Sequence, residues 1–436
     1  MARIAPISRR TVNSALLCAL TAGCVSNGLV DKDLPQPHTP LGADRAKPPA
    51  PQATVTPPTA TPAPPPPPIL SFDEAVTNAT HAVLTAAPAP EAAPAMVVID
   101  PLVDEITGYQ SSATQSIQAR IVGLMKKDFP QYAAQRITSQ SLERQPRFLI
   151  GTFTPINAEL KPVGQRESYW FCLVMGDLKT GKIVAKSVAR ARMEGVDATP
   201  VAAFGDSPIW TEDPSIQAYV TTCKESKVGD PIRPEYLDGL LAAAMVSEAG
   251  NAYQEGHYAE ALDLYKTARE SPAGKQLRVY NGVYLSLTKL GRTGAAAAAF
   301  GDLVDYGLRR KRLAVKFLFR PGSIRFARDS SFSGNYAMWI HQIATRAVAD
   351  QVCLQVTGHT SPSGTAALND RLSLLRAEYI QSRLETDQAA LAKRILAAGM
   401  GSRENLIGTG RDDASDMLDR RVELKPIEPC TKGSRA

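Results

Sequence analysis

The chain has 436 residues, with 49 Lys and Arg against 43 Asp and Glu and a formal net charge of +6 at pH 7. This length is typical of about three domains of roughly 150 residues each. The charge is modest and the basic residues are spread along the chain, so the composition gives no support for nucleic-acid binding. We interpret the largest basic run, RRKR at 309–312, as a solvated segment between domains.

Residues 1–24 have the pattern of a bacterial targeting segment, with three arginines near the start and a short apolar run at 15–20. That run is too short to span a bilayer. The sequence LTAGC ending at Cys24 resembles a lipobox, in which the cysteine becomes the N-terminus and carries palmitate and related acyl chains. Val25 at the next position implies sorting to the outer membrane. A plain secretory signal cut nearby is the alternative.

Residues 25–68 are rich in proline and end in five consecutive prolines. Such a composition cannot bury a core and predicts a disordered segment with polyproline II character. Its reach would be about 36 Å as a flexible coil and about 136 Å if fully extended. We interpret this segment as a tether between a lipid anchor and folded domains.

Residues 69–235 predict an α/β domain. Ser71 and Glu74 form a capping box before an apolar-periodic helix, and a strand follows at 96–100. A second helix, a strand and a hairpin come next, which gives the order αβαβββ. The pattern resembles FlgO-type envelope lipoproteins. The helix carries Ile117 and Ile121, the strand spans 147–153, and the hairpin joins 169–174 to 183–188 around the turn 176–181.

Three acidic residues, Asp100, Asp104 and Glu105, follow the strand at 96–100. Active sites of α/β proteins often lie after strands. No histidine, cysteine or phosphate-binding glycine loop joins these acids in sequence, so we interpret them as a solvated turn. The histidines are too scattered to predict a metal site. The sequence therefore predicts a protein that is not an enzyme and has no cofactor.

Residues 236–308 contain an internal repeat. Gly256 and Gly291 are 35 residues apart, as are Ala261 and Ala296, and Tyr265 is followed at the same interval by Phe300. The period resembles tetratricopeptide repeats and implies two helical hairpins with a groove for an unidentified protein partner. A purely structural four-helix spacer is the alternative.

A strand at 352–357 leads into a small-residue loop and then a helix. Along that helix Leu368, Leu372, Leu375 and Tyr379 recur at a helical period, which predicts a buried stripe. Arg376 lies on a neighbouring face, from which it can point back toward the loop and form an anion pocket. An ordinary surface arginine is the alternative.

The same region resembles the OmpA-like C-terminal domain family over about residues 315–428. The resemblance rests on Gly358-His359-Thr360, on Asn369, on Leu372-Ser373 and Arg376-Ala377, and on LDRRVE at 418–423, with 319–324 matching the opening strand. It implies a βαβαβ domain that binds the peptidoglycan stem peptide non-covalently. Where the family has an Asp that takes the ammonium of the stem diamino acid, this chain has Ser361, whereas Arg376 matches the family arginine that takes its carboxylate. The implied binding residues are His359, Thr360, Ser361, Asn369, Leu372, Arg376 and Arg421.

Four cysteines remain once Cys18 and Cys24 are assigned to the targeting segment. They fall two and two into separate domains, and the periplasm is oxidising. Three pairings are possible, and the domain division favours Cys172–Cys223 and Cys353–Cys430.

Together these patterns predict an α+β multidomain lipoprotein of the outer membrane that faces the periplasm. It would connect the membrane to peptidoglycan and contact a protein through its repeats. The alternative is an assembly scaffold of an envelope or secretion complex whose OmpA-like domain has lost wall binding. The predicted parts are the signal at 1–24, the tether at 25–68, the α/β domain at 69–235, the repeats at 236–308 and the OmpA-like domain at 309–436.

Overall fold

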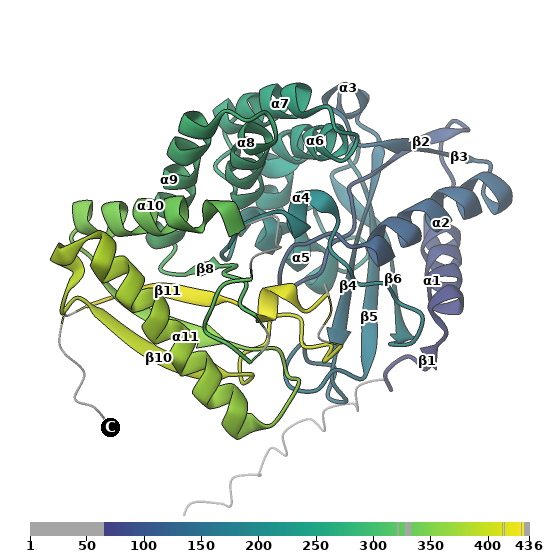
Figure 1. Cartoon of the computed structure of the whole chain (residues 1–436). Helices are drawn as coiled ribbons and strands as arrows, with labels where there is room; N and C mark the ends of the chain where they lie inside the picture. The colour runs from purple at the N-terminus through teal and green to yellow at the C-terminus, as the bar shows by residue number, and fades with distance from the viewer. Residues whose placement is uncertain are drawn as a thin grey trace, which may run out of the picture. The chain divides into compact units, whose positions relative to one another are not determined.

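The computed structural model describes residues 65–320, 322–327, 333–411, 413, 415–428 and 430. Cys24, the targeting segment and nearly all of the predicted tether lie outside these residues. The described part contains two β-sheets and a set of longer helices, so the predicted α+β class is confirmed (Figure 1). Within it, no helix combines the length and the apolar character that a membrane span requires.

The first sheet has six strands in the order β1-β6-β5-β4-β2-β3. Strands β4, β5 and β6 pair antiparallel, and β2 runs parallel to both β3 and β4. The predicted strands and hairpin are present, whereas β1 and β3 were not predicted. The strands are β1 (Ile69–Leu70), β2 (Ala95–Ile99), β3 (Tyr132–Arg136), β4 (Arg147–Ile156), β5 (Ser168–Asp177) and β6 (Lys182–Arg192).

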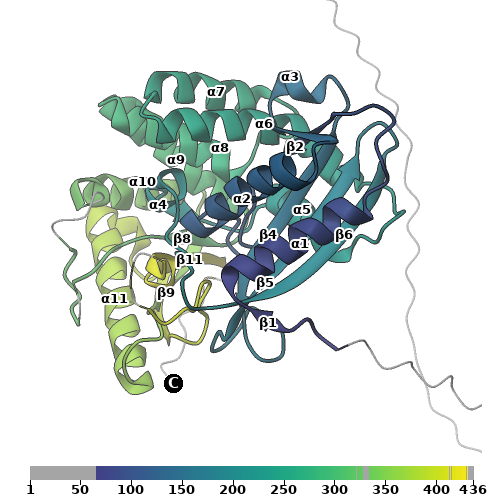
Figure 2. The same cartoon turned by 90° about the vertical axis from the view of Figure 1, so that its right-hand side faces the viewer.

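Helices α1 (Phe72–Ala86) and α2 (Ser112–Asp128) cover one face of this sheet (Figure 2). The predicted capping box starts α1, because Ser71 Oγ accepts the Glu74 backbone N–H at 3.3 Å while the Glu74 carboxylate accepts the Ser71 N–H at 3.1 Å. These bonds satisfy backbone donors that a helix start leaves unpaired. A local sequence signal therefore fixes where the helix begins.

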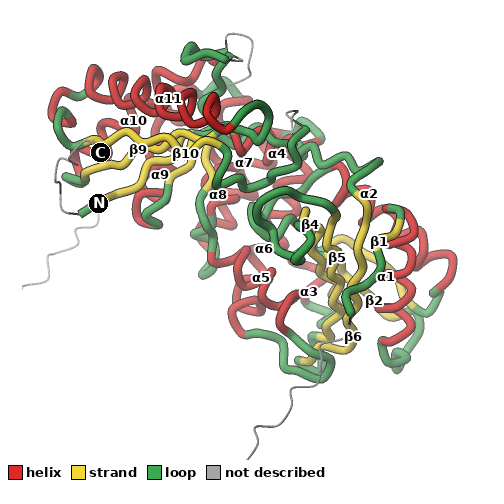
Figure 3. Tube along the Cα trace, turned by 90° about the horizontal axis from the view of Figure 1, so that it is seen from below, coloured by secondary structure: helices red, strands yellow, loops and turns green. Residues whose placement is uncertain are grey.

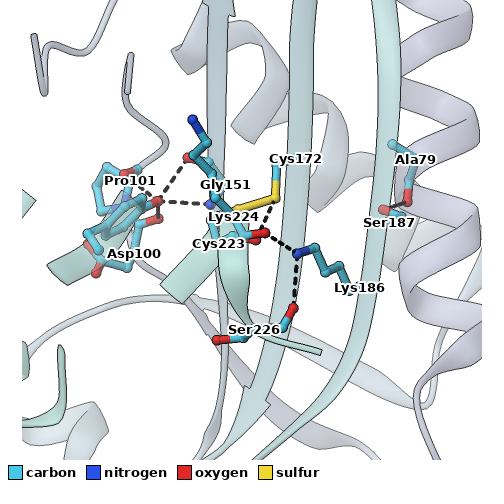
Figure 4. The surroundings of a disulfide bond; sticks show 11 residues. Ala79, Asp100, Pro101, Gly151, Cys172, Lys186, Ser187, Cys223, Lys224 and Ser226 are labelled. Carbon is cyan, nitrogen blue, oxygen red and sulfur yellow. Dashed lines mark hydrogen bonds between the residues drawn. A yellow bond between two sulfur atoms is a disulfide. The ribbon is translucent and has the colours of Figure 1, made fainter. Parts of the chain in front are cut away.

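The opposite face of the first sheet is covered by α5 (Pro214–Glu225) and by α6 (Pro234–Gln254), and the tube in Figure 3 shows these helices and α1 on the two sides of the strands. Cys172 on β5 is bonded to Cys223 on α5, as predicted. Lys186 on β6 donates to the carbonyl oxygens at the end of α5, at 2.8 and 2.9 Å (Figure 4). The short helices α3 (Ser139–Leu142) and α4 (Ala202–Gly205) complete this part.

The acidic turn after β2 is buried, so its interpretation as a solvated turn is wrong. Asp100 is 2% exposed and Glu105 is 6% exposed. Tyr236 Oη donates to Asp100 Oδ2 at 3.1 Å. Burial raises the pKa of Asp100 and the pKa of Asp104 to about 6. The sequence pattern could not reveal this, because α5 and α6 cover the carboxyl end of β2 from more than 100 residues away.

The repeat region forms the two expected helical hairpins. Gly256 and Gly291 end the first helix of each hairpin at φ of +83° and +68°, values that favour glycine. Gly282 permits close packing, since a Cβ there would lie 2.3 Å from the Tyr265 ring. The helices are α6, α7 (Tyr258–Glu270), α8 (Leu277–Lys289) and α9 (Thr293–Arg309).

The second sheet has five strands in the order β10-β9-β11-β8-β7. Helices α10 (Tyr336–Ala349) and α11 (Ala366–Asp387) belong to this part, with short 3-10 helices at Ser333–Asn335, Ala389–Leu391 and Met417–Asp419. Cys353 is bonded to Cys430, which is the second predicted pair. The strands are β7 (Ile209–Trp210), β8 (Leu313–Val315), β9 (Cys353–His359), β10 (Ile395–Gly401) and β11 (Val422–Ile427).

Two details of the second sheet differ from the sequence interpretation. The described residues of 319–324 do not form its opening strand. Phe319 makes only an isolated bridge with Phe326, and β8 takes that place beside β11. The two phenylalanine rings instead pack on Tyr379 of α11. In addition, β7 comes from the region assigned to the first domain. One hydrophobic core therefore runs from the helical hairpins into the second sheet.

The basic run at 309–312 is solvated only in part. Arg309, Arg310 and Lys311 are exposed. Arg312 instead lies over the Trp210 ring and binds Glu423 on β11, with its Nη2 2.8 Å from Oε1. The interpretation as a solvated segment is wrong for Arg312. Strand β8 begins at the next residue, so the side chain of Arg312 lies against the second sheet.

Candidate functional site

Strand β9 and helix α11 approach each other closely where the candidate site begins. A Cβ atom on Gly358 would lie 2.0 Å from the Ser373 carbonyl oxygen, and one on Gly399 would lie 2.7 Å from the Leu374 backbone nitrogen. Glycine at both positions lets the helix lie directly on β9 and β10. Thr365 caps the helix, with its Oγ1 accepting the Leu368 N–H at 3.3 Å. The loop between strand and helix is thereby held at the carboxyl end of β9.

The prediction that Leu368, Leu372, Leu375 and Tyr379 form a buried stripe on α11 is wrong. Leu368 is 55% exposed and Leu375 is 38% exposed. Small and polar side chains face the sheet instead, because the close approach at Gly358 leaves no room for leucines near the start of the helix. The buried residues of α11 are Asn369, Ser373, Arg376, Ala377, Ile380 and Leu384.

Asn369 organises the loop that precedes α11. Its Nδ2 donates to the Ser363 carbonyl oxygen at 2.9 Å and lies 3.5 Å from that of Ser361. The hydroxyls of Ser361 and Ser363 lie 3.3 Å apart. Asn405 Nδ2 donates to the Thr360 carbonyl oxygen at 2.8 Å. The turn carrying Thr360 and Ser361 is therefore held from both sides, and both residues are buried.

Arg376 contacts the segment after β8. Its Nε donates to the Ser323 carbonyl oxygen at 3.2 Å, and its Nη2 lies 3.4 Å from that of Arg320. The guanidinium lies 4.9 Å from the centre of the Phe319 ring, within cation–π range. The side chain is 5% exposed. Arg376 is thus not an ordinary surface arginine, and its cation contacts Phe319, Arg320 and Ser323.

A second group of charged side chains is buried between β9, β11 and β8. Arg421 Nη2 lies 2.6 Å from Glu423 Oε1, and Arg312 binds the same carboxylate through both Nε and Nη2. His359 Nε2 lies 3.8 Å from Glu423 Oε1, and neither ring nitrogen has a hydrogen-bond partner. Glu423 is therefore ionised between two arginines.

The pKa values of this group follow from its neighbours. Burial pushes the pKa of Glu423 upward, but Arg421 and Arg312 outweigh burial and hold it at about 2. Burial, reinforced by Arg421, lowers the pKa of His359 to about 3. The histidine is consequently neutral at physiological pH and cannot attract an anion as a cation would.

Asp419 holds the loop between β10 and β11. Its carboxylate accepts the backbone N–H groups of Leu406, Ile407 and Gly408 at 2.6, 2.9 and 2.7 Å. Burial raises the pKa of Asp419. The loop also reaches the first sheet, where Arg411 donates to the Val196 carbonyl oxygen at 2.5 Å. Asp419 therefore holds residues 406–408 in place, and Arg411 joins the loop to the segment after β6.

Residues 318–416 match the model of the OmpA family. This stretch is an OmpA-like domain. Solved structures similar to the chain include the peptidoglycan-associated lipoprotein from Burkholderia pseudomallei, at 24% identity over 26% of this chain and 89% of that chain, with a TM-score of 0.22. Another is the cell wall anchor of the T6SS from Pseudomonas aeruginosa, at 22% identity over 26% and 79% of the two chains, also with a TM-score of 0.22. No curated protein matches the chain.

The predicted site residues of the OmpA-like domain fall into two groups. Thr360, Ser361 and Asn369 lie at the loop before α11, and Leu372 and Arg376 follow on that helix. The other two, His359 and Arg421, belong to the buried charged group around Glu423. Their roles toward a ligand stay predictions.

Sequence reasoning missed Glu423 and Arg312 as partners of this site. Arg421 directly precedes β11 and Glu423 lies on it, two positions later. In extended chain this spacing places both side chains on one face, which is a signal that could have paired them. No local sequence pattern identifies Arg312 as a partner of this site, because it binds Glu423 from 111 residues away in the chain. In the described ranges no group of His, Cys, Asp and Glu side chains is arranged to hold a metal ion.

Proposed function

We propose that this protein is a lipid-anchored protein of the outer membrane that connects the membrane to peptidoglycan through its OmpA-like domain, without catalysis. The match of residues 318–416 to the OmpA family is the observation that supports it. Arg376 supplies a cation for the carboxylate of a stem-peptide diamino acid. Ser361 supplies a hydrogen bond for its ammonium group, and Asn369 holds the loop in shape.

The geometry favours weak binding. Ser361 is neutral where the family has an Asp, so the ammonium lacks a charge-assisted partner. Such a contact is worth about 1.5–3 kcal/mol, or roughly tenfold to a hundredfold in affinity. Arg376 must also exchange its bond to the Ser323 carbonyl for the carboxylate of the ligand. Asp370 does not replace the missing acid, because it pairs with Arg403.

Sedimentation with isolated peptidoglycan tests the proposal. The experiment needs the whole mature chain, since β7 comes from outside the OmpA-like domain and completes its sheet. We expect the wild-type chain to sediment with peptidoglycan and Arg376→Ala to stay in solution. The matched control is Arg371→Ala, which removes an exposed arginine from the same helix. Equal sedimentation of Arg376→Ala and Arg371→Ala would exclude Arg376 as the ligand contact.

The second candidate function is an assembly scaffold whose OmpA-like domain no longer binds the wall. The observation that favours it is the burial of Arg376 and Ser361 together with the neutral side chain of the latter. A folded wild-type chain that fails to sediment with peptidoglycan would select this candidate.

The lipid anchor at Cys24 is a separate part of the proposal, and it rests on the lipobox alone. Cells producing the wild-type chain and given labelled palmitate should yield a labelled protein in the outer-membrane fraction. The Cys24→Ser variant should lose both the label and the membrane association. Retention of the label by this variant would contradict lipidation at Cys24.

The protein partner is proposed to bind the helical repeats. Leu237 and Leu241 are one turn apart on α6, and they are 38% and 45% exposed. A double Leu237→Glu/Leu241→Glu variant should lose crosslinked products that the wild-type chain forms in the envelope. Val122→Glu, at a 39% exposed position on α2, is the control and should keep them. Unchanged products in the double variant would place the partner elsewhere.

A further inference from the structure

A cavity that the proposed function does not use lies at the carboxyl end of β2. Its walls come from the loop after β2, from β7 and the residues after it, and from helices α4 to α8. The volume of the cavity is about 50 Å³. One water requires about 10–15 Å³, so the cavity has room for a small organic group. Loops after parallel strands are frequent ligand sites in α/β sheets.

Much of the cavity wall is apolar and aromatic. Phe204 lies 5.0 Å from Tyr109 between ring centres, and Trp210 is fixed by its Nε1, which donates to the Thr107 carbonyl oxygen at 3.0 Å. Tyr265 from α7 and Val246 from α6 extend the apolar wall. An apolar group of a ligand would be removed from water here without meeting a charged surface.

Four residues of the same wall each have a buried polar atom with no hydrogen-bond partner: Tyr109 Oη, Thr211 Oγ1, Asn281 Oδ1 and Arg278 Nε. Tyr109, Thr211 and Asn281 are each more than nine-tenths buried. The side-chain nitrogen of Asn281, Nδ2, does have a partner and donates to the Ile209 carbonyl oxygen at 3.0 Å. Buried polar atoms without partners are rare in folded proteins. Their concentration around one cavity indicates that something polar completes them.

The chemistry of these four atoms specifies their partner. Two hydroxyls and the Arg278 N–H can donate, whereas Asn281 Oδ1 can only accept. A complementary molecule must therefore offer an acceptor and a donor close together, as an amide group does. Charge argues for a neutral ligand, because both acids of the wall already have partners. Glu212 pairs with Arg312 at 3.2 Å, and Asp213 accepts the backbone N–H groups of Ser215 and Leu277.

We propose that this cavity is a binding site for a small neutral molecule that joins an apolar or aromatic body to an amide group. The amide oxygen accepts from the hydroxyls and from Arg278, and the amide N–H donates to Asn281. The apolar body lies against Phe204 and Trp210. The site does not depend on wall binding or on the lipid anchor.

The first test compares three probes of similar size by calorimetric titration of the mature chain. Benzamide has an aromatic ring and a neutral amide, toluene lacks the amide, and benzoate replaces it with a charge. Saturable binding of benzamide at one site, with toluene and benzoate at least tenfold weaker, is the expected result. No benzamide binding would mean that water alone fills the cavity and would overturn the proposal. Equal binding of toluene or benzoate would overturn its assignment of a neutral amide.

Matched variants connect binding to the cavity. Thr211→Val replaces a wall hydroxyl by a methyl group of the same shape and should weaken benzamide about threefold to tenfold. Thr152→Val is the control, because Thr152 Oγ1 is also buried without a partner but lies on β4, outside the cavity. Equal effects of the two variants on affinity would exclude Thr211 as a contact.

Filling the cavity gives a second, independent result. Gly250 lines it from α6, and an added Cβ there would lie 3.8 Å from Tyr265 Oη, an ordinary contact. Gly250→Leu should therefore fold and abolish benzamide binding. Gly123→Leu is the control on α2, where an added Cβ meets nothing within 4 Å. Retained binding in a folded Gly250→Leu variant would place the benzamide site elsewhere and overturn the proposal.

Discussion

The two sheets of this protein bury acidic side chains in opposite ways. Near the first sheet, Asp100 bonds to the hydroxyl of Tyr236, and burial raises its pKa to about 6. In the second sheet, Glu423 lies between Arg421 and Arg312, which hold its pKa at about 2 despite burial. The two carboxyl groups differ chiefly in whether a guanidinium is in contact. A proton therefore neutralises the buried acid of the first sheet only below about pH 6, whereas arginine cations neutralise that of the second sheet at pH 7.

This difference predicts opposite responses to acid. A carboxyl group whose folded pKa is raised destabilises the fold when it is ionised, so Asp100 favours folding more as the pH falls from 7 toward 4. A carboxyl group whose folded pKa is lowered stabilises the fold when ionised, so the contribution of Glu423 is lost as the pH falls below about 4.5 toward 2. Mild acid therefore increases the stability that Asp100 contributes near the first sheet, whereas the stability that Glu423 contributes to the second sheet is lost only in stronger acid.

The largest effect is expected from breaking the ion pairs of the second sheet. Glu423→Gln leaves Arg421 buried without an anionic partner, and removal of one member of such a pair costs about 3–5 kcal/mol. Urea unfolding at pH 7 should show this loss, and the gap between variant and wild type should shrink toward pH 2. Glu404→Gln is the control, because that side chain is exposed. Equal midpoints for both variants would show that the pairs contribute nothing.

Removing one disulfide at a time compares how much each bond contributes to the stability of its part of the protein. Cys172–Cys223 closes a loop of 51 residues and Cys353–Cys430 one of 77. The chain-entropy model assigns about 4 kcal/mol to each loop. Paired Cys→Ser variants should therefore lose similar free energies of unfolding, measured with oxidised wild type as reference. A loss in one pair that exceeds the other by several kcal/mol would show that native contacts, rather than loop length, decide the contribution.

Replacing the acid of the first sheet should stabilise the protein. Asp100→Asn keeps an acceptor for Tyr236 and removes a buried charge. A pKa raised from 3.8 to about 6 corresponds to about 3 kcal/mol, and this gain should be present at pH 8 and absent near pH 4. Thermal unfolding at both pH values measures it. A gain that is the same at pH 4 and pH 8 would mean that ionisation of Asp100 is not its source.

Sequence reasoning succeeded where structure is determined by near neighbours. The capping box of Ser71, the hairpin of β5 and β6, and the glycines that end α6 and α8 all depend on residues within one turn or one strand. The OmpA-like residues from Gly358 to Ala377 were recognised in the same way, as a local motif. Both disulfide pairs were inferred from the predicted division of the chain into domains.

The sequence did not predict features of the fold that depend on contacts with a distant segment. Leu368 was assigned to a buried stripe, yet Gly358 brings β9 so close to α11 that Ser373 and Asn369 face the sheet instead. β7 has two residues, too few for a periodic signal, and pairs with β8 across the whole repeat region. The acids after β2 were assigned to solvent because the helices that cover them come much later in the chain.

The smallest expected effect concerns the loop at the end of β9, where the second sheet lacks an acid that its family has. Ser361→Asp would place a carboxylate on the loop held by Asn369 and provide a charged partner for a stem ammonium. We expect peptidoglycan binding to tighten about tenfold, measured by sedimentation over a range of peptidoglycan concentrations. Ser363→Asp is the control, because it adds the same charge two residues away at an exposed position. Tightening by both variants would indicate general attraction, whereas tightening by neither would show that this loop does not contact the ammonium. Tightening by Ser361→Asp alone would show that a carboxylate at this position strengthens binding because the ammonium of the ligand neutralises it. Asp100 and Asp104 near the first sheet differ, since a proton neutralises them below about pH 6.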